Sequence, residues 1–166
     1  IEYKSDSGET ILPVKINTNT VFSKAQNIID YKNQSFDEND FKRQPLMLFM
    51  YSKTGPVIAK GDENDDGLED LFISGDKNKP GKIYLQQKDG SYKIVDGLNI
   101  GDESLSATSA AAFFDANGDG FNDLYVAKGG SSLFEHNTPP LQEELYLNDG
   151  KDNLQLSKTS LPDVSA

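Results

Sequence analysis

Short β-prone runs separated by turns recur along the chain after residue 55. Leu71-Phe72-Ile73 and Leu124-Tyr125-Val126 consist of residues that favour strands, and a glycine follows each run. Asp-Gly pairs at 89–90 and 149–150 indicate hairpin turns, because glycine adopts positive φ angles at no steric cost. The predicted strands are 71–73, 82–87 and 92–95 in a first group and 124–126, 144–148 and 154–156 in a second. The pattern predicts an all-β fold.

The two groups of strands belong to an internal repeat. Residues 57–73 align with residues 110–126 at an offset of 53, and residues 83–85 align with residues 145–147 at an offset of 62. The additional residues of the second copy fall in a Pro-Pro-containing loop at 131–144. About four strands in roughly 50 residues is the size of a propeller blade. The sequence therefore predicts a partial β-propeller with about two four-stranded blades.

The character of the chain changes at about residue 45. Residues 1–45 are interpreted as an N-terminal extension with some strand character at 11–16. Residues 46–166 are interpreted as the two repeats, which occupy approximately 46–100 and 101–160.

Two blades cannot close a propeller, which usually takes four to eight. We therefore expect the chain to be a piece of a longer propeller, or to complete a ring with other copies. Phe113, Tyr125 and Leu145 are expected on open blade faces, which either other copies of the chain or residues 1–45 would cover. The apolar run Leu46–Tyr51 is expected to add a strand to the core.

Each repeat contains the pattern Asp-x-Asn-x-Asp-Gly-x-x-Asp, which places oxygen donors at positions 1, 3, 5 and 9. The glycine at position 6 lets the chain turn sharply enough to aim the carbonyl of position 7 at a central ion. The first predicted ligand set is Asp62, Asn64, Asp66, the Leu68 carbonyl and Asp70. The second is Asp115, Asn117, Asp119, the Phe121 carbonyl and Asp123.

These ligand sets point to calcium, which takes six to eight hard oxygen ligands. The EF-hand has the same opening, but it also needs a Glu at position 12 and flanking helices. Position 12 is Ile73 or Val126, and both lie in strand-like runs. The sequence therefore predicts two Ca²⁺ sites in loops that run into β-strands. The remaining acidic residues of the first loop, Glu63, Asp65 and Glu69, are expected to point outward into solvent.

Charge and composition narrow the partners and the chemistry. The net charge of −11 disfavours nucleic acid, whose phosphates it would repel. The absence of cysteine excludes disulfides and thiolate metal sites, and the single histidine, His136, disfavours zinc. No apolar run approaches the roughly 20 residues that span a bilayer. A catalytic triad would depend on His136 alone, so we expect no catalytic residues.

The loops and their flanking strands resemble the FG-GAP/VCBS repeat family, the blades of integrin-type β-propellers. The resemblance covers residues 40–160 and is specific at the two loops, where Asp65 replaces the glycine common at position 4. Residues 40–46 are also similar to the segment before the first repeat in bacterial surface proteins that pair these repeats with an ASPIC/UnbV module.

The resemblance implies a calcium-stabilised, non-catalytic binding or structural module of an exported bacterial protein, at the cell surface, in the periplasm or outside the cell. The expected partner is a glycan or a protein, and homo-oligomers or further blades of a longer chain are expected in assembly. The alternative is a piece of a glycan hydrolase or lyase in which calcium is structural. Turnover of glycan by the full-length protein would favour the alternative.

Overall fold

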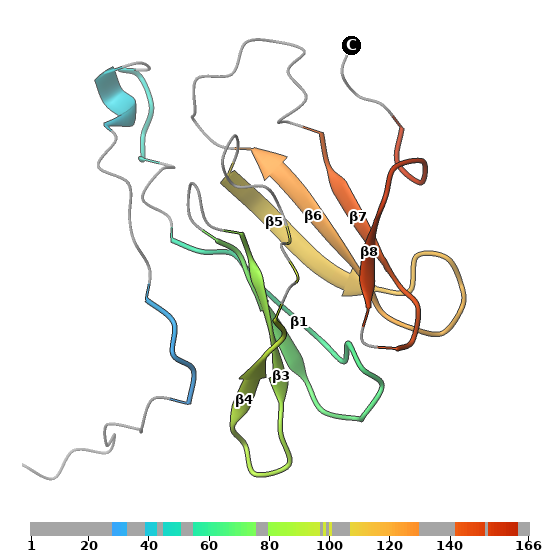
Figure 1. Cartoon of the computed structure of the whole chain (residues 1–166). Coiled ribbons are helices and arrows are strands. Elements are labelled where there is room, and N and C mark those ends of the chain that lie inside the picture. Colours follow the sequence, from blue (N-terminus) through green and yellow to red (C-terminus); the bar gives the residue numbers. More distant parts are fainter. Residues whose placement is uncertain are drawn as a thin grey trace, which may run out of the picture.

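The computed structural model is an all-β arrangement of two four-stranded antiparallel sheets, which confirms the predicted fold class (Figure 1). A single turn of 3-10 helix, η1 (Asp40–Lys42), precedes the strands. No helix in the described part of the chain is long and apolar enough to cross a membrane. The structure describes residues 28–32, 39–42, 45–50, 55–75, 80–96, 98, 100, 107–129, 142–151 and 153–162.

Sequential hairpins form the first sheet. Its strands, in spatial order, are β1 (Ile58–Gly61), β2 (Asp70–Ile73), β3 (Lys82–Gln86) and β4 (Tyr92–Ile94). Each strand pairs with the next one in the chain, so β1 and β4 are the two edges. Ala59 pairs with Phe72 and Phe72 pairs with Ile83, which places these three side chains on one face.

The second sheet repeats this topology. Its strands are β5 (Ala107–Phe114), β6 (Asp123–Gly129), β7 (Glu144–Asn148) and β8 (Leu154–Ser157). The strand β5 is longer than its counterpart β1 and contains a bulge between Thr108 and Ala110. The segments 144–148 and 82–86 have the same length, as expected for two copies of one unit.

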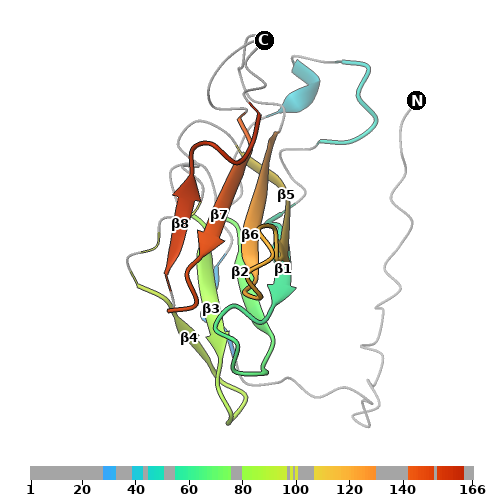
Figure 2. The same cartoon turned by 90° about the vertical axis from the view of Figure 1, so that its right-hand side faces the viewer.

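The hydrophobic core lies between the two sheets, which stand one behind the other in Figure 2. Ala59, Phe72, Ile83 and Ile100 come from the first repeat, and Leu124, Val126, Tyr146 and Leu154 come from the second. Phe72, Ile83 and Leu124 are fully buried. Each sheet therefore buries one face against the other, as neighbouring propeller blades do.

A buried ion pair also lies on this inner face. The Lys128 ammonium is 3.6 Å from a Glu144 carboxylate oxygen, and the Lys128 side chain is only 2% exposed. The hydroxyl of Tyr146 donates a 2.8 Å hydrogen bond to the same oxygen of Glu144. The pair thus links β6 to β7 within the second sheet.

Two expectations from the sequence are wrong. Residues 45–50 form no strand, and Leu46 is 96% exposed, because both sheets are complete without this segment. Leu145 and Phe113 do not lie on an unpacked face: Leu145 is 5% exposed, and Phe113 packs against the core between the sheets. Tyr125 is half-buried.

Three parts of the sequence prediction lie outside the described residues. They are the predicted strand at 11–16, the last residue of the run 46–51 and most of the insertion at 131–144, including His136.

The two sheets approach each other closely at Gly61. A Cβ atom at this position would lie 2.5 Å from the Cβ of Phe113 and 2.8 Å from its Cγ. The backbones of β1 and β5 come together here because glycine has no side chain, and β1 lies against β5 as a result.

We predict that Gly61→Ala lowers the free energy of unfolding by about 1–3 kcal/mol, because the added methyl group overpacks a rigid inter-sheet contact. Chemical denaturation monitored by fluorescence would measure the change. Lys60→Ala, at the neighbouring exposed position, is the control and should stay within about 0.5 kcal/mol of the parent. Equal stabilities of the Gly61 variant and the parent would contradict the close contact.

Candidate metal centres

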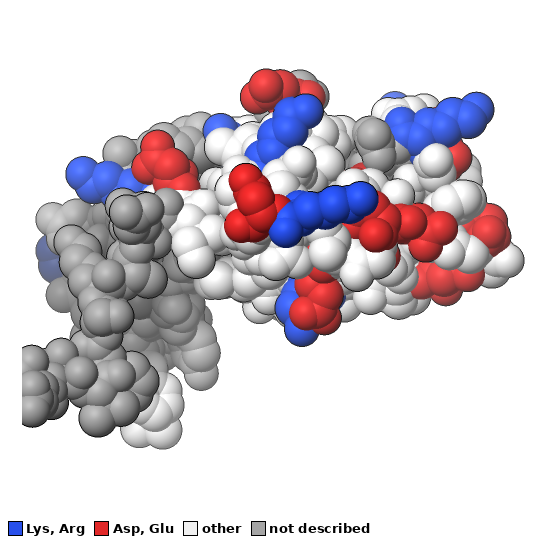
Figure 3. All heavy atoms as spheres, turned by 90° about the horizontal axis from the view of Figure 1, so that it is seen from below, with Lys and Arg blue, Asp and Glu red and all other residues white. Residues whose placement is uncertain are grey.

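The two Asp/Asn-rich loops occupy equivalent places in the two sheets. Residues 62–69 connect β1 to β2, and residues 115–122 connect β5 to β6. Both loops lie towards the lower right of Figure 1, and acidic side chains gather on the right-hand side of the view from below in Figure 3. Strands rather than helices flank both loops, which agrees with the rejection of an EF-hand.

Side chains of the first loop accept hydrogen bonds from the loop's own backbone. The two Asp62 carboxylate oxygens accept from the amides of Asp66 and Gly67, at 3.1 and 2.8 Å. The Asn64 carbonyl oxygen accepts from the Asp66 amide at 3.2 Å. One Asp66 oxygen accepts from the Leu68 amide at 2.8 Å. The side chains at positions 1, 3 and 5 are therefore folded inward over the loop.

The second loop repeats this network bond for bond. Asp115 accepts from the amides of Asp119 and Gly120, at 3.2 and 3.0 Å. Asn117 accepts from the Asp119 amide at 2.9 Å, and Asp119 accepts from the Phe121 amide at 2.9 Å. One bond is additional, from the Gly118 amide to Asp115 at 2.7 Å. The sequence repeat is thus also a repeat of side-chain conformation.

Positive φ angles at positions 4 and 6 make this winding possible. At position 4, Asp65 has a φ of 57° and Gly118 a φ of 81°. At position 6, the φ angles of Gly67 and Gly120 are 82° and 95°. Left-handed backbone is strained for most side chains, and aspartate is among the few that tolerate it. Asp65 therefore keeps the loop geometry although it replaces a glycine.

The aspartate at position 9 of each loop is fully buried and braces the loop against the sheet. The Asp70 oxygens accept from the amide of Glu63 at 2.9 Å and from the amide of Gln86 at 2.8 Å. The Asp123 oxygens accept from the amide of Ala116 at 2.9 Å and from the amide of Asn148 at 2.8 Å. Each carboxylate thus joins its loop to the end of the third strand of its sheet.

Burial raises the pKa of Asp70, and the two backbone hydrogen bonds oppose this effect. The carboxylates of Asp66 and Asp62 raise the pKa of Asp70 further. The carboxylates of Asp66 and Asp62 are therefore near enough to repel that of Asp70. A cation among them would relieve this repulsion.

Glu63 does not point outward as the sequence predicted. It is only 2% exposed, because the first loop docks on the second sheet, whereas Asp65 and Glu69 are exposed as expected. The Asn148 amide group donates to the Glu63 carbonyl at 2.6 Å. The Asn122 amide group donates to the Asp62 carbonyl at 2.8 Å.

Asn122 and Asn148 are structural residues of the site that the sequence analysis missed. Both join the first loop to the second repeat, over 60 and 85 residues of sequence. In the sequence, the only indication of such a role was the position of Asn148 directly before the Asp-Gly turn.

The oxygen donors agree with the chemistry of calcium. Every predicted side-chain ligand presents oxygen, and each carboxylate oxygen that accepts one amide hydrogen keeps further acceptor capacity. Within the described residues, however, no three carboxylate or imidazole groups converge into a cluster that is ready to hold a metal ion. Amide and backbone carbonyl oxygens would therefore have to complete the coordination.

A comparison with known protein families gives a match to the region that contains both loops. Residues 62–126, which run from the start of the first loop through the second loop into β6, match the family described as FG-GAP-like repeat. The match supports the resemblance to FG-GAP repeats and covers less than half of the chain. Searches of curated proteins and of solved structures found no match.

A substitution at Gly120 tests the effect of backbone conformation alone on stability, because a Cβ atom there would meet no heavy atom within 4 Å. We predict that Gly120→Ala lowers the free energy of unfolding by about 1–2 kcal/mol, the cost of left-handed backbone for an L-residue. Gly120→Asn should lose clearly less, since asparagine tolerates this conformation. Thermal denaturation of both variants would test this, and equal losses would contradict a backbone origin.

Proposed function

We propose that this protein is a non-catalytic binding module of β-propeller type, with one calcium ion in each of its two loops. The observation that carries the proposal is the duplicated hydrogen-bond network, which turns the side chains at positions 1, 3 and 5 inward in both copies. The match of residues 62–126 to the FG-GAP-like repeat supports the same assignment, because such repeats are typical of binding and structural modules.

Three carboxylates and one amide oxygen per loop would hold the ion, with the Leu68 or Phe121 carbonyl as a further ligand. The calcium would neutralise carboxylates that otherwise repel one another, and would fix the turn that leads into β2 or β6. Since position 9 also bonds the third strand, the ion would stabilise the sheet as well as the loop.

We expect two calcium ions per chain in isothermal titration calorimetry, and weaker competition by magnesium, which demands tight octahedral geometry. Asp66→Asn should weaken calcium binding at the first site by at least about tenfold. Even mutation of a residue that only hydrogen-bonds to a metal ligand typically lowers metal affinity by about 10–100-fold. Asp65→Asn removes the same charge from the next position, which is not a proposed ligand, and should have a smaller effect. Asp119→Asn tests the second loop in the same way.

The folded, metal-stripped protein must bind calcium for the proposal to stand. An absence of binding heat at millimolar calcium in such a sample would refute it. At a hundredfold excess over Kd, binding adds about 2.7 kcal/mol to the stability. Removal of calcium by a chelator should therefore lower the melting temperature by roughly 5–10 °C.

The biological setting follows from the resemblance to FG-GAP repeats. We propose an exported bacterial protein that recognises a glycan or a protein at the cell surface, in the periplasm or outside the cell. The net charge of −11 suits cations, or partners with basic patches. The pairing with an ASPIC/UnbV module rests only on the likeness of residues 40–46 and stays a prediction.

The outer face of the second sheet supports a further proposal on assembly. Ala112 and Tyr125 are register partners on this face; Ala112, at its β5 edge, is exposed, and Tyr125 is half-buried. In a propeller the next blade would cover such a face.

We expect the isolated chain to self-associate through this face, as measured by light scattering. Ala112→Arg should make it monomeric, because an arginine would be desolvated in the contact. Gln87→Arg, in the exposed β3–β4 turn, adds the same charge elsewhere and should leave the association unchanged. A parent chain that remains monomeric would count against assembly by this route.

A further inference from the structure

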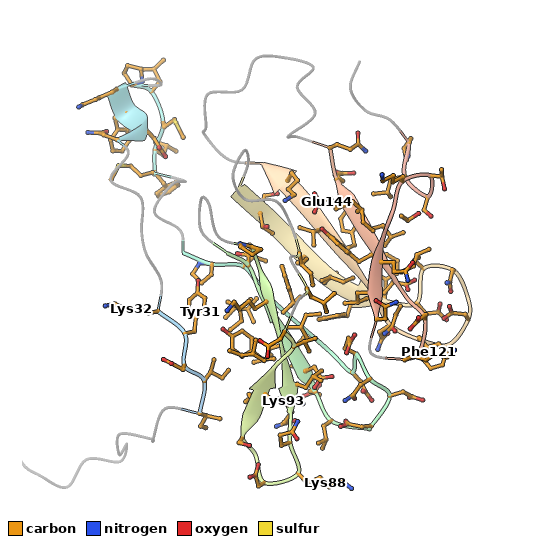
Figure 4. The ribbon with its side chains drawn as sticks, in the orientation of Figure 1. Tyr31, Lys32, Lys88, Lys93, Phe121 and Glu144 are labelled. Carbon is orange, nitrogen blue, oxygen red and sulfur yellow. The ribbon has the colours of Figure 1, made fainter. Side chains whose placement is uncertain are left out.

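A pocket of about 300 Å³ lies on the outer face of the first sheet, away from both loops. Residues 30–32 form one wall, and the ends of β2, β3 and β4 form the rest. Figure 4 shows the segment with Tyr31 and Lys32 beside this sheet. The volume is at the lower end of the range for small-molecule sites, which is roughly 300–1,000 Å³.

The floor of the pocket is apolar and aromatic. Tyr84 and Ile94 are register partners on β3 and β4, and Ile73 lies beside them on β2. Tyr84 is 3% exposed and Ile73 is 5% exposed, so both support the floor from beneath, and the half-buried Tyr31 and Ile94 offer the accessible apolar surface. These side chains belong to the face opposite the core, since Phe72 and Ile83 alternate with them and point to the second sheet.

The rim carries one negative and one positive side chain, because Asp30 and Lys82 are both exposed lining residues. Burial raises the pKa of Tyr84, and the negative charge of Asp30 raises it further. Lys32 also borders the pocket, but its side chain extends away from the sheet in Figure 4.

Tyr31 fastens the wall to the sheet. Its hydroxyl is 3.4 Å from the Ser74 carbonyl at the end of β2. Ser74 is itself fixed, because its hydroxyl accepts a 2.9 Å hydrogen bond from the Val57 amide. The wall is thus placed by a tertiary contact over 43 residues.

We propose that this pocket binds a neutral sugar, one or two rings in size, with the ring against Tyr31 and Ile94 and its hydroxyls between Asp30 and Lys82. A sugar has an apolar C–H face and a hydroxyl edge, which match an aromatic floor below a polar rim. Tyrosine suits such a ligand because it joins an apolar body to a hydroxyl group. The proposal specifies the ligand class for the proposed binding role and does not depend on calcium.

Other ligand classes fit less well. Asp30 and Lys82 carry opposite charges, and the Lys32 side chain extends away from the sheet, so the charges that face the pocket favour neither an anion nor a cation. A purely apolar ligand would cover both charged groups without giving either a hydrogen bond, which is costly. A small zwitterion matches the two charges but would cover little of the apolar floor.

The pocket is separated from the first calcium loop by the length of β2. The loop ends at Asp70, at the start of β2, and the pocket begins at Ile73, at its end. Three residues of strand span about 10 Å. Failure of calcium binding and failure of sugar binding can therefore be told apart.

We would titrate ¹⁵N-labelled full chain with the methyl glycosides of glucose, galactose, mannose and xylose, one at a time. At least one glycoside should shift the amide signals of Ser74, Lys82, Tyr84 and Ile94, with a Kd in the millimolar range. Asp30→Asn and Lys82→Gln should each raise this Kd about tenfold, because each removes a hydrogen bond to a charged group. Lys88→Gln, in the exposed β3–β4 turn, is the matched control and should leave the Kd unchanged.

Three results would overturn the proposal. The first is no shift of these amides with any glycoside. The second is a Kd that Asp30→Asn and Lys82→Gln leave unchanged. The third is a shift with the zwitterion L-alanine at lower concentration than with every glycoside. A repeat of the titration with Asp66→Asn should give the parent Kd for the glycoside, since this variant disturbs only the proposed calcium site.

Discussion

The buried aspartate at the ninth loop position is the interaction on which the rest of the structure depends. Asp70 and Asp123 are both fully buried, and each accepts backbone hydrogen bonds from the start of its loop and from its third strand. An unpaired carboxylate is very costly to bury, so these amides must stay in place for the chain to fold. The same bonds set the end of the loop and its distance from the third strand.

The first loop is also part of the contact between the sheets. Its backbone carbonyls at Asp62 and Glu63 accept hydrogen bonds from Asn122 and Asn148 of the second repeat. These hydrogen bonds therefore add to the contact that the core around Phe72 and Leu124 makes between the two sheets. An ion in this loop would act on the packing of the two sheets, and not only on a surface turn.

The sequence was sufficient for features that depend on local spacing. Short stretches of sequence were enough to predict the strands after each loop, the Asp-Gly turns and the repeated oxygen-donor pattern. The fold class followed from the regular spacing of the predicted strands and turns. Features that depend on long-range contacts were not accessible. Glu63 reads as a solvated charge until the second sheet is placed against it, and Leu46 reads as core although no strand is available to pair with it. The pocket forms because residues 30–32 lie beside the first sheet. No periodic pattern in the sequence indicates this contact.

The two loops are alike in conformation but differ in how much freedom they lose on folding. Position 4 is Asp65 in the first loop and Gly118 in the second, at similar positive φ angles. In the unfolded chain, glycine adopts more backbone conformations than any other residue. The second loop, with two glycines, therefore loses more backbone entropy when it folds into the same shape. The first loop has less entropy to lose but carries the steric strain of a left-handed aspartate. One duplicated unit thus reaches the same winding by two different balances of entropy and strain.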